Sequence, residues 1–446
     1  MSSPSSDGYN RNAIFWICVL ALFAAAMSFS LRIGVSGAIK EALFDPVNPL
    51  HSGEMIAAAL GNSFLGFAIT LLIISPILDV LGAKRVILLA SACFIAGPAL
   101  IVASPYAGSP ALTYQVLMLG MIICGVAWGC TEGSINPVTA ALYPEDNTHR
   151  LNVLHAWWPA GIVTGGLLSI LLFQQLHLGW QFAIAMIGIP GALCGLLALT
   201  QTFPKTERPG VPFREMIVEP FKRPTFWIFP LIMFLTASAE LAPGSWVDVA
   251  LTQTVGMPGI LVLVYTSAIM FVMRHFAGFL DHRFSDMGLL WFCTVPAGVG
   301  LYLLSVASSP LTAIVAATAW AFGVCFMWPT MLAAVARRYP RGGPWTIGIT
   351  GFAGAMAIYY VLPELGKIYD EAKLEAAGGE GAFAALTPGA DLSRALAFAA
   401  ERSFQTVAII PAILFVIFGL VWAIERGRKR KLGADNIDST PPASPG

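Results

Sequence analysis

A chain of 446 residues that is 57% hydrophobic and only 11% charged cannot be an ordinary soluble protein, because soluble domains carry about 25% charged residues. The mean hydropathy of +0.74 agrees, and we interpret the chain as an integral membrane protein. The formal net charge is zero, which excludes nucleic-acid binding through a large excess of positive charge.

Apolar runs long enough to cross a bilayer recur along the chain, separated by glycine, proline or charged residues. A membrane-spanning helix needs about 20 apolar residues, and the sequence predicts twelve such helices. We place them at 13–36, 55–78, 85–104, 112–142, 151–173, 179–200, 225–251, 258–280, 287–306, 310–336, 344–369 and 402–425.

The segment 201–224 divides these helices into two bundles of six, 13–200 and 225–426, because it is rich in proline and charge. Weak internal symmetry supports this division: LDVLGAKR after the second helix is echoed by LDHRFSDM after the eighth, and Asp79 and Asp281 are 202 residues apart. Two similar halves around a central site are a known transporter design. The predicted class is an all-α integral membrane protein with twelve transmembrane helices in two pseudo-symmetric six-helix bundles.

The distribution of positive charge predicts the orientation. If the polar tail 1–12 is cytoplasmic, 19 of the 25 Lys and Arg residues lie in inner segments and five in outer ones, with Arg32 inside a helix. Both termini are then cytoplasmic, in what we expect to be a bacterial inner membrane. The one sizeable outer segment, 370–401, is predicted to be helical at its Ala-rich ends and a loop at its centre. The tail 427–446 begins with a basic cluster suited to anionic lipid headgroups and is predicted to end disordered.

Polar residues inside this membrane protein gather at 130–161. Glu132 lies about 15 Å from the inner end of the fourth helix, where burial favours the neutral acid that a proton carrier needs. Polar groups at this depth indicate function, although a structural carboxylate is the alternative. His155 is a candidate proton relay or hydrogen-bond donor to a substrate hydroxyl, and equally a helix-contact histidine. Asn136 and Asn152 suit substrate hydroxyls or contacts between helices.

Three further candidates lie outside that stretch. Arg32, in the first helix, needs a carboxylate partner, with Glu132 or Glu240 as candidates. The alternative is that its long side chain extends so that the charged group reaches the outer membrane interface. Glu240 places a second acid in the C-terminal half. Aromatic faces that suit sugar rings, or alternatively the membrane interface, are offered by Trp158, Trp246 and Trp328.

Catalytic motifs are missing from the sequence: it has no Gly-x-Ser-x-Gly, HExxH or Walker pattern, and its seven cysteines lie in apolar runs without metal-ligand spacing. We therefore expect neither an enzyme nor an ATP-driven pump, no cofactor, and a proton as coupling ion, with sodium as the alternative. A receptor or a membrane hydrolase is disfavoured, since large soluble domains and nucleophile motifs are not visible.

The segment DVLGAKR at 79–85 resembles the signature loop between the second and third helices of the major facilitator superfamily, with Ser75 where a glycine is usual. A looser copy surrounds Asp281 in the second half. The resemblance implies that a set of charged and glycine residues controls the conformational change: Asp79, Gly82, Lys84, Arg85, Arg150, Arg274, Asp281 and Arg283.

Within that superfamily the chain is most similar to the fucose permease and the fucose–galactose–glucose symporter group. The similarity is carried by Glu132, Asn136-Pro137, Pro144-Glu145, Arg150-Leu151-Asn152, His155 and Gly161, and more loosely by Arg274 and Trp328-Pro329-Thr330. It implies a monomeric, proton-coupled sugar symporter working by alternating access, with Glu132 and His155 in coupling. The chain departs at Arg32, where that family has an acid, so an anionic solute such as a sugar acid, or export, is the alternative.

Overall fold

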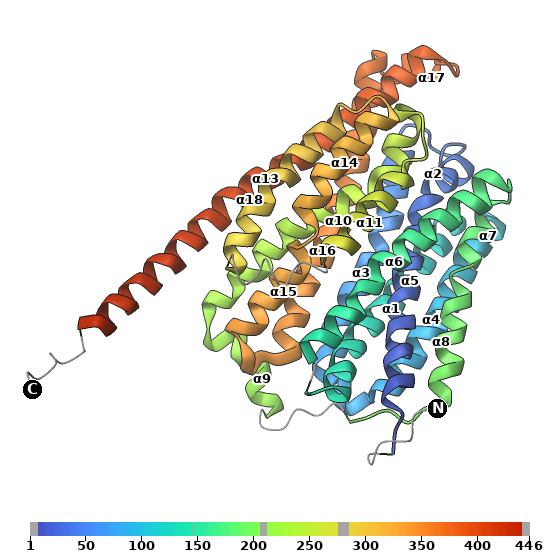
Figure 1. Cartoon of the computed structure of the whole chain (residues 1–446). Coiled ribbons are helices and arrows are strands. Elements are labelled where there is room, and N and C mark those ends of the chain that lie inside the picture. Colours follow the sequence, from blue (N-terminus) through green and yellow to red (C-terminus); the bar gives the residue numbers. More distant parts are fainter. Residues whose placement is uncertain (1–7, 146, 206–211, 275–284, 439–446) are drawn as a thin grey trace, which may run out of the picture.

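The computed structural model describes residues 8–145, 147–205, 212–274 and 285–438, and the regular structure within them is entirely helical. The long helices stand side by side, with the short helix α17 (Glu380–Ala384) at one end of the bundle. The N-terminus and α9 (Phe213–Lys222) lie at the opposite end (Figure 1). We call these the α17 end and the α9 end; the charge distribution predicts that the α9 end is cytoplasmic.

The N-terminal half consists of α1 (Arg11–Gly34), α2 (Ser36–Ile39), η1 (Lys40–Phe44), α3 (Ser52–Leu81), α4 (Ala83–Ala103), η2 (Ser104–Tyr106), α5 (Pro110–Leu142), α6 (Asn147–Ser169), η3 (Ile170–Gln175), α7 (Trp180–Ala185) and α8 (Gly188–Leu199). After α9, the C-terminal half consists of η4 (Pro224–Trp227), α10 (Ile228–Val255), α11 (Ile260–Arg274), α13 (Asp286–Ser305), α14 (Pro310–Val324), α15 (Met327–Arg338), η5 (Pro340–Gly342), α16 (Gly343–Ala377), α17 and α18 (Ala390–Asp438).

Eleven helical segments in the described ranges are long and apolar enough to cross a membrane. The remaining predicted span, 258–280, corresponds to α11, which is described as far as Arg274. Asp281 and Arg283 lie outside the described residues. With α11 as the twelfth, the structure confirms the predicted all-α fold of two six-helix bundles.

Two predicted boundaries differ from the structure at the C-terminal end. The Ala-rich ends of the outer segment 370–401 are helical, as predicted, but they join the neighbouring spans: α16 continues beyond 369 to Ala377, and α18 starts before 402, at Ala390. The glycine pair 378–379, both at positive φ, ends α16. Part of the tail 427–446, predicted to become disordered after its basic cluster, continues α18 as far as Asp438, and this helix projects from the bundle (Figure 1); residues 439–446 lie outside the described part of the chain.

Glycines let neighbouring helices approach closely at equivalent places in the two halves. A Cβ at Gly120 of α5 would lie 2.9 Å from the carbonyl oxygen of Gly97 in α4, and one at Gly300 of α13 would lie 2.2 Å from the backbone nitrogen of Trp320 in α14. Gly300 follows Gly97 by 203 residues, as Gly323, which contacts α13, follows Gly120. This spacing agrees with the predicted internal repeat.

The tightest of these contacts predicts a large loss of stability for a small substitution. In Gly125→Ala the new Cβ would lie 1.9 Å from the backbone oxygen of Ser63, so α3 and α5 must separate. We expect this overpacking to cost about 1–3 kcal/mol and to lower the thermal unfolding midpoint of the purified protein. Gly188→Ala is the control, since open space surrounds Gly188 on α8. Equal midpoints for the two variants would contradict the prediction.

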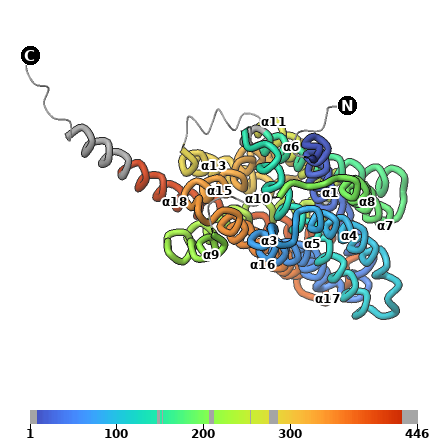
Figure 2. The backbone as a smooth tube through the Cα atoms, turned by 90° about the horizontal axis from the view of Figure 1, so that it is seen from below, coloured from blue at the N-terminus to red at the C-terminus, as the bar shows by residue number. Residues whose placement is uncertain are grey.

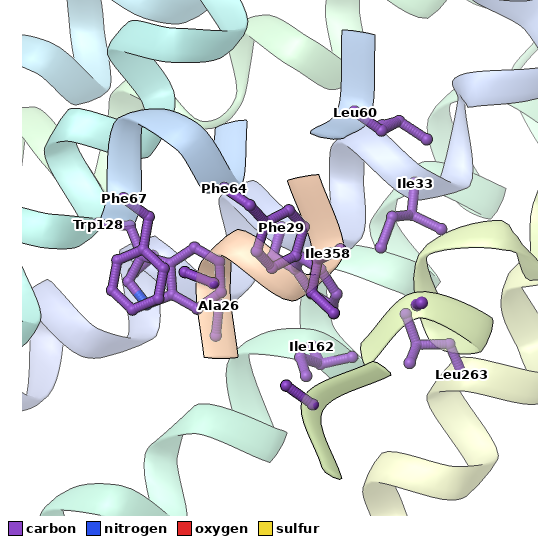
Figure 3. Packing of buried hydrophobic residues seen from close by; sticks show 14 of the residues in the cluster. Ala26, Phe29, Ile33, Leu60, Phe64, Phe67, Trp128, Ile162, Leu263 and Ile358 are labelled. Carbon is purple, nitrogen blue, oxygen red and sulfur yellow. The ribbon is translucent and has the colours of Figure 1, made fainter. Parts of the chain in front are cut away.

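The two halves meet along two helix pairs: α3 packs against α16, and α6 packs against α11. Figure 2, viewed from below, shows α3 beside α16 and α6 beside α11. Buried apolar residues from both halves fill part of this interface, including Phe29 and Phe64 from the N-terminal half and Leu263 and Ile358 from the C-terminal half (Figure 3). A polar side chain at this interface therefore lies where a substrate would be exposed to each side of the membrane in turn.

Candidate functional site

Three side chains from the stretch 130–161 meet between α5 and α6. Asn136 lies one helical turn after Glu132 on α5, and its Nδ2 donates to the Glu132 backbone oxygen at 3.3 Å and lies 3.5 Å from the Glu132 Oε2. His155 on α6 places its Nε2 2.8 Å from the Asn136 Oδ1. The structure thus joins Glu132, Asn136 and His155 in one hydrogen-bonded cluster, and each of them remains partly exposed.

The hydrogen bonds of this cluster determine which ring nitrogen of the histidine donates. Because Asn136 donates through Nδ2, its Oδ1 accepts, and His155 must donate through Nε2. His155 Nδ1 is then the ring atom that can accept a proton. The arrangement places two titratable groups, a carboxyl and an imidazole, on opposite sides of one amide.

The C-terminal half contributes an ion pair built on a broken helix. Pro329 lies in the first turn of α15 and has no backbone N–H, so the carbonyl of Cys325 four residues earlier loses its helical partner. The Arg274 Nε donates to that carbonyl at 3.2 Å, and the Trp328 N–H donates to the Glu240 Oε2 at 3.2 Å. The Arg274 Nη2 lies 4.0 Å from the Glu240 Oε1, and the Glu240 side chain is 6% exposed. The break between α14 and α15 is therefore occupied by a buried carboxyl group and a partly buried guanidinium.

Arg274 also connects the two halves electrostatically. Its guanidinium lies within electrostatic reach of both Glu132 and His155, which belong to the other half. The resemblance had placed Arg274 among the residues that control the conformational change. The structure places it beside Glu240, facing the polar cluster of the other half.

The tryptophans divide into two groups. Trp158 stacks on Trp128 with ring centroids 4.8 Å apart, and the other face of Trp128 stacks on Phe67 at 4.2 Å. Trp158 and Trp328 are partly exposed, as a substrate contact requires. Trp246 does not fit its predicted role as a substrate contact: it is 1% exposed and packs edge-on against Tyr369 of α16, so no face of its ring is available to a solute.

Arg32 lies in neither of the two places predicted for it. It is 2% exposed, so it does not reach an outer interface. Among the described residues, no carboxylate oxygen lies within 4.0 Å of its guanidinium nitrogens. Its Nε donates to the Ser28 backbone oxygen at 3.0 Å, and its Nη1 lies 3.9 Å from the Met121 sulfur. It borders a cleft between the halves that is too narrow for a water molecule, lined by Phe29, Arg32, Ile33, Leu60, Ser63, Phe64 and Ser245.

The N-terminal members of the set predicted to control the conformational change lie toward the α9 end. Gly82 adopts φ +81° between α3 and α4, a conformation that favours glycine. The Lys84 Nζ donates to the backbone oxygens of Leu199 and Gln201 at 2.9 and 2.8 Å. Asp79 and Arg85 are exposed. Arg150 stacks over the ring of Tyr143 at 4.5 Å and of Phe15 at 5.8 Å. The side chain of Asn152 lies outside the described part of the structure.

Two similar bundles, a polar site at their interface and a helix broken at that site are typical of secondary transporters. The sequence model of the Major Facilitator Superfamily matches residues 16–360. The chain belongs to the major facilitator superfamily. It is therefore a multi-pass membrane transporter for small solutes and not an enzyme. No curated protein sequence matches it.

Solved transporters share this fold at low sequence identity. A D-xylose-proton symporter is 13% identical, with 90% of this chain and 97% of that chain covered and a TM-score of 0.70. A bacterial homologue of the human lysosomal transporter Spinster, inward-facing and unoccupied, is 16% identical, with 94% and 97% covered and a TM-score of 0.69. The fucose:proton symporter of E. coli is 16% identical, with 91% and 98% covered and a TM-score of 0.57. The likeness places this superfamily member in no particular substrate group.

Sequence reasoning did not predict that Arg274 binds the backbone carbonyl freed at the break between α14 and α15. The signal was present as Trp328-Pro329, since a proline inside an apolar helix frees the carbonyl four residues earlier. What the sequence did not reveal is which side chain would take up that carbonyl.

This arrangement predicts that Pro329→Ala impairs transport without unfolding the protein. Alanine restores an N–H that competes with the Arg274 guanidinium for the Cys325 carbonyl. We expect an unchanged or higher thermal midpoint and an uptake rate reduced by about tenfold, equivalent to roughly 1.4 kcal/mol. Pro296→Ala, in α13, is the control for restoring a helix hydrogen bond elsewhere. Full uptake by Pro329→Ala would show that the break has no role in transport.

Proposed function

We propose that this transporter couples the uptake of a sugar to a proton by alternating access. The observation that carries the proposal is the cluster of Glu132, Asn136 and His155, which lies at the interface of the halves and within electrostatic reach of Arg274. A carboxyl that is partly screened from water and faces a cation on the opposite half can gain or lose a proton as the halves move.

The proton step follows from this geometry. With the site open to the outside, the Glu132 carboxylate gains a proton, and the neutral cluster binds the solute. The halves then rock about the site, and Glu132 releases its proton to the cytoplasm, where the approach of Arg274 favours the carboxylate. His155 Nδ1 is the group through which the proton would enter or leave.

Sugar as the cargo is supported by the chemistry of the lining. Asn136 and His155 offer hydrogen bonds to hydroxyls, and the partly exposed rings of Trp158 and Trp328 offer flat apolar faces. Asn152 remains a candidate from the sequence alone. Two solved transporters of the same fold are, by name, a D-xylose-proton symporter and a fucose:proton symporter.

A second cargo, an anionic solute such as a sugar acid, is favoured by one observation. Arg32 is buried between the halves, and no described carboxylate lies within ion-pairing distance of it. A buried guanidinium is stabilised strongly by a carboxylate, which it can bind through two parallel hydrogen bonds. If the cleft beside it widens during transport, a substrate carboxylate would supply that partner.

Ligand-dependent thermal stabilisation tests both cargoes, because a ligand that binds the folded state raises its apparent stability. We would heat the purified protein with neutral hexoses and pentoses, and separately with sugar acids, in sodium-free buffer at pH 5.5 and 7.5. A pH-dependent shift with a neutral sugar supports the first proposal. A shift confined to sugar acids supports the second. A shift that requires added sodium would contradict proton coupling.

The two cargoes also predict opposite outcomes for Arg32→Gln. A neutral sugar should still be taken up within about threefold of the original rate, since glutamine keeps a hydrogen-bond donor. Uptake of a sugar acid should fall by about 100-fold, because a charge-assisted pair of hydrogen bonds contributes about twice as much as a neutral one. The measurement is initial uptake of each labelled solute into cells, normalised to folded protein.

A further inference from the structure

A group of hydrogen bonds between the two halves lies at the α17 end. Asp370 of α16 reaches across the interface, and its Oδ2 accepts the Glu54 N–H at 2.7 Å while its Oδ1 accepts the Gly53 N–H at 3.2 Å. Both amides belong to the first turn of α3. The N-terminus of a helix has unpaired N–H groups and a positive dipole, so a carboxylate is well placed there.

Lys373 completes the contact from one turn further along α16. Its Nζ lies 2.5 Å from the Asp370 Oδ1 and donates to the Pro49 backbone oxygen at 2.8 Å. Both side chains are almost fully buried, at 2% and 3% exposure. Together they connect the C-terminal half to three backbone groups of the N-terminal half.

A second carboxylate of the C-terminal half makes a similar contact nearby. The Asp248 Oδ2 on α10 accepts the Gly37 N–H of α2 at 3.1 Å, and its Oδ1 accepts from Thr252 at 3.3 Å. Asp248 is itself buried, at 7% exposure. Both acids thus bind backbone amides of the opposite half.

The backbones also touch at this point. A Cβ at Gly366 would lie 2.5 Å from the backbone oxygen of Gly53, and one at Gly53 would lie 2.6 Å from the Asp370 Oδ1. The packing leaves no room for a solute to pass between the first turn of α3 and α16.

We propose that Asp370, paired with Lys373, is the main polar contact that closes the α17 end of the transporter, and that Asp248 is the second. The proposal rests on alternating access, in which the halves must separate at this end to expose the central site. Separation would break these hydrogen bonds and return both charges to water. Their strength therefore sets how often the α17 end opens.

The test measures access to Ser245 from outside intact cells. Ser245 lies on α10 beside Arg32 and is 1% exposed, and Ser245→Cys is a nearly isosteric change. A membrane-impermeant maleimide added outside labels this cysteine above the background of the native cysteines only when the α17 end opens. In the Ser245→Cys background, Asp370→Ala should speed labelling about tenfold or more, because the closed state alone loses charge-assisted bonds.

A second variant removes the same hydrogen bond from the other half. Glu54→Pro deletes the N–H that Asp370 accepts, at a first-turn position where proline is tolerated. Glu54→Ala keeps that N–H and is its matched control. Asp391→Ala, which breaks an exposed ion pair with Arg394 inside one half, is the control for Asp370→Ala.

We expect faster labelling in Asp370→Ala and Glu54→Pro, and unchanged labelling in Glu54→Ala and Asp391→Ala. If Asp370→Ala fails to fold, Glu54→Pro decides the question. Labelling rates that do not differ from those of the controls overturn the proposal. Labelling reports conformation and needs no transport, so this result is independent of whether Glu132 carries the proton.

Discussion

Glu132→Gln should abolish proton-driven accumulation while leaving substrate exchange intact. With one proton per solute, a gradient of one pH unit supports about tenfold accumulation. Glutamine resembles the protonated acid in shape and hydrogen bonding but releases no proton, so the accumulation ratio should fall to about one. Exchange of labelled for unlabelled solute across proteoliposomes should continue, because it needs binding and rocking but no net proton movement.

The matched control for this variant is Glu364→Gln, which neutralises an exposed acid on α16 at some distance from the cluster. It should accumulate substrate like the unmodified transporter. If Glu132→Gln keeps concentrative, pH-dependent uptake, the coupling group lies elsewhere, and Glu240 becomes the next candidate.

Arg274→Met should be the most destabilising change within the site. It leaves Glu240 buried without its cation and the Cys325 carbonyl without its donor. Removing one partner of a buried pair costs about 3–5 kcal/mol, and we expect about 3 kcal/mol because the closest N–O distance is 4.0 Å. Transport should be lost as well, since Arg274 is the cation that faces Glu132.

A double substitution separates loss of charge balance from loss of packing. Arg274→Met with Glu240→Gln removes both charges, and it should recover a large part of the thermal midpoint without restoring transport. Arg394→Met is the control, because it breaks an exposed pair with Asp391, and such pairs contribute about 0–1 kcal/mol. If Arg274→Met is no more destabilising than Arg394→Met, the pair does not stabilise the break between α14 and α15.

Sequence alone determined the membrane class, the twelve spans and the two halves, because the bilayer forces apolar runs of fixed length. It also singled out Glu132, since an acid at membrane depth is costly wherever its neighbours lie. The sequence predicts only part of the cluster of Glu132, Asn136 and His155. The first two lie one helical turn apart on the same helix, whereas the contact with His155 depends on how α6 packs against α5.

Only the tertiary structure decided which polar groups meet across the interface. Asp370 was hidden in a segment predicted to lie mainly outside the membrane, yet it binds the first turn of α3, more than 300 residues away in the chain. Trp246 and Trp158 look alike in sequence, but one ring is enclosed and the other is not. Hydropathy and local spacing fix how each helix forms, whereas the rotation of a helix against its neighbours depends on packing that no single segment encodes.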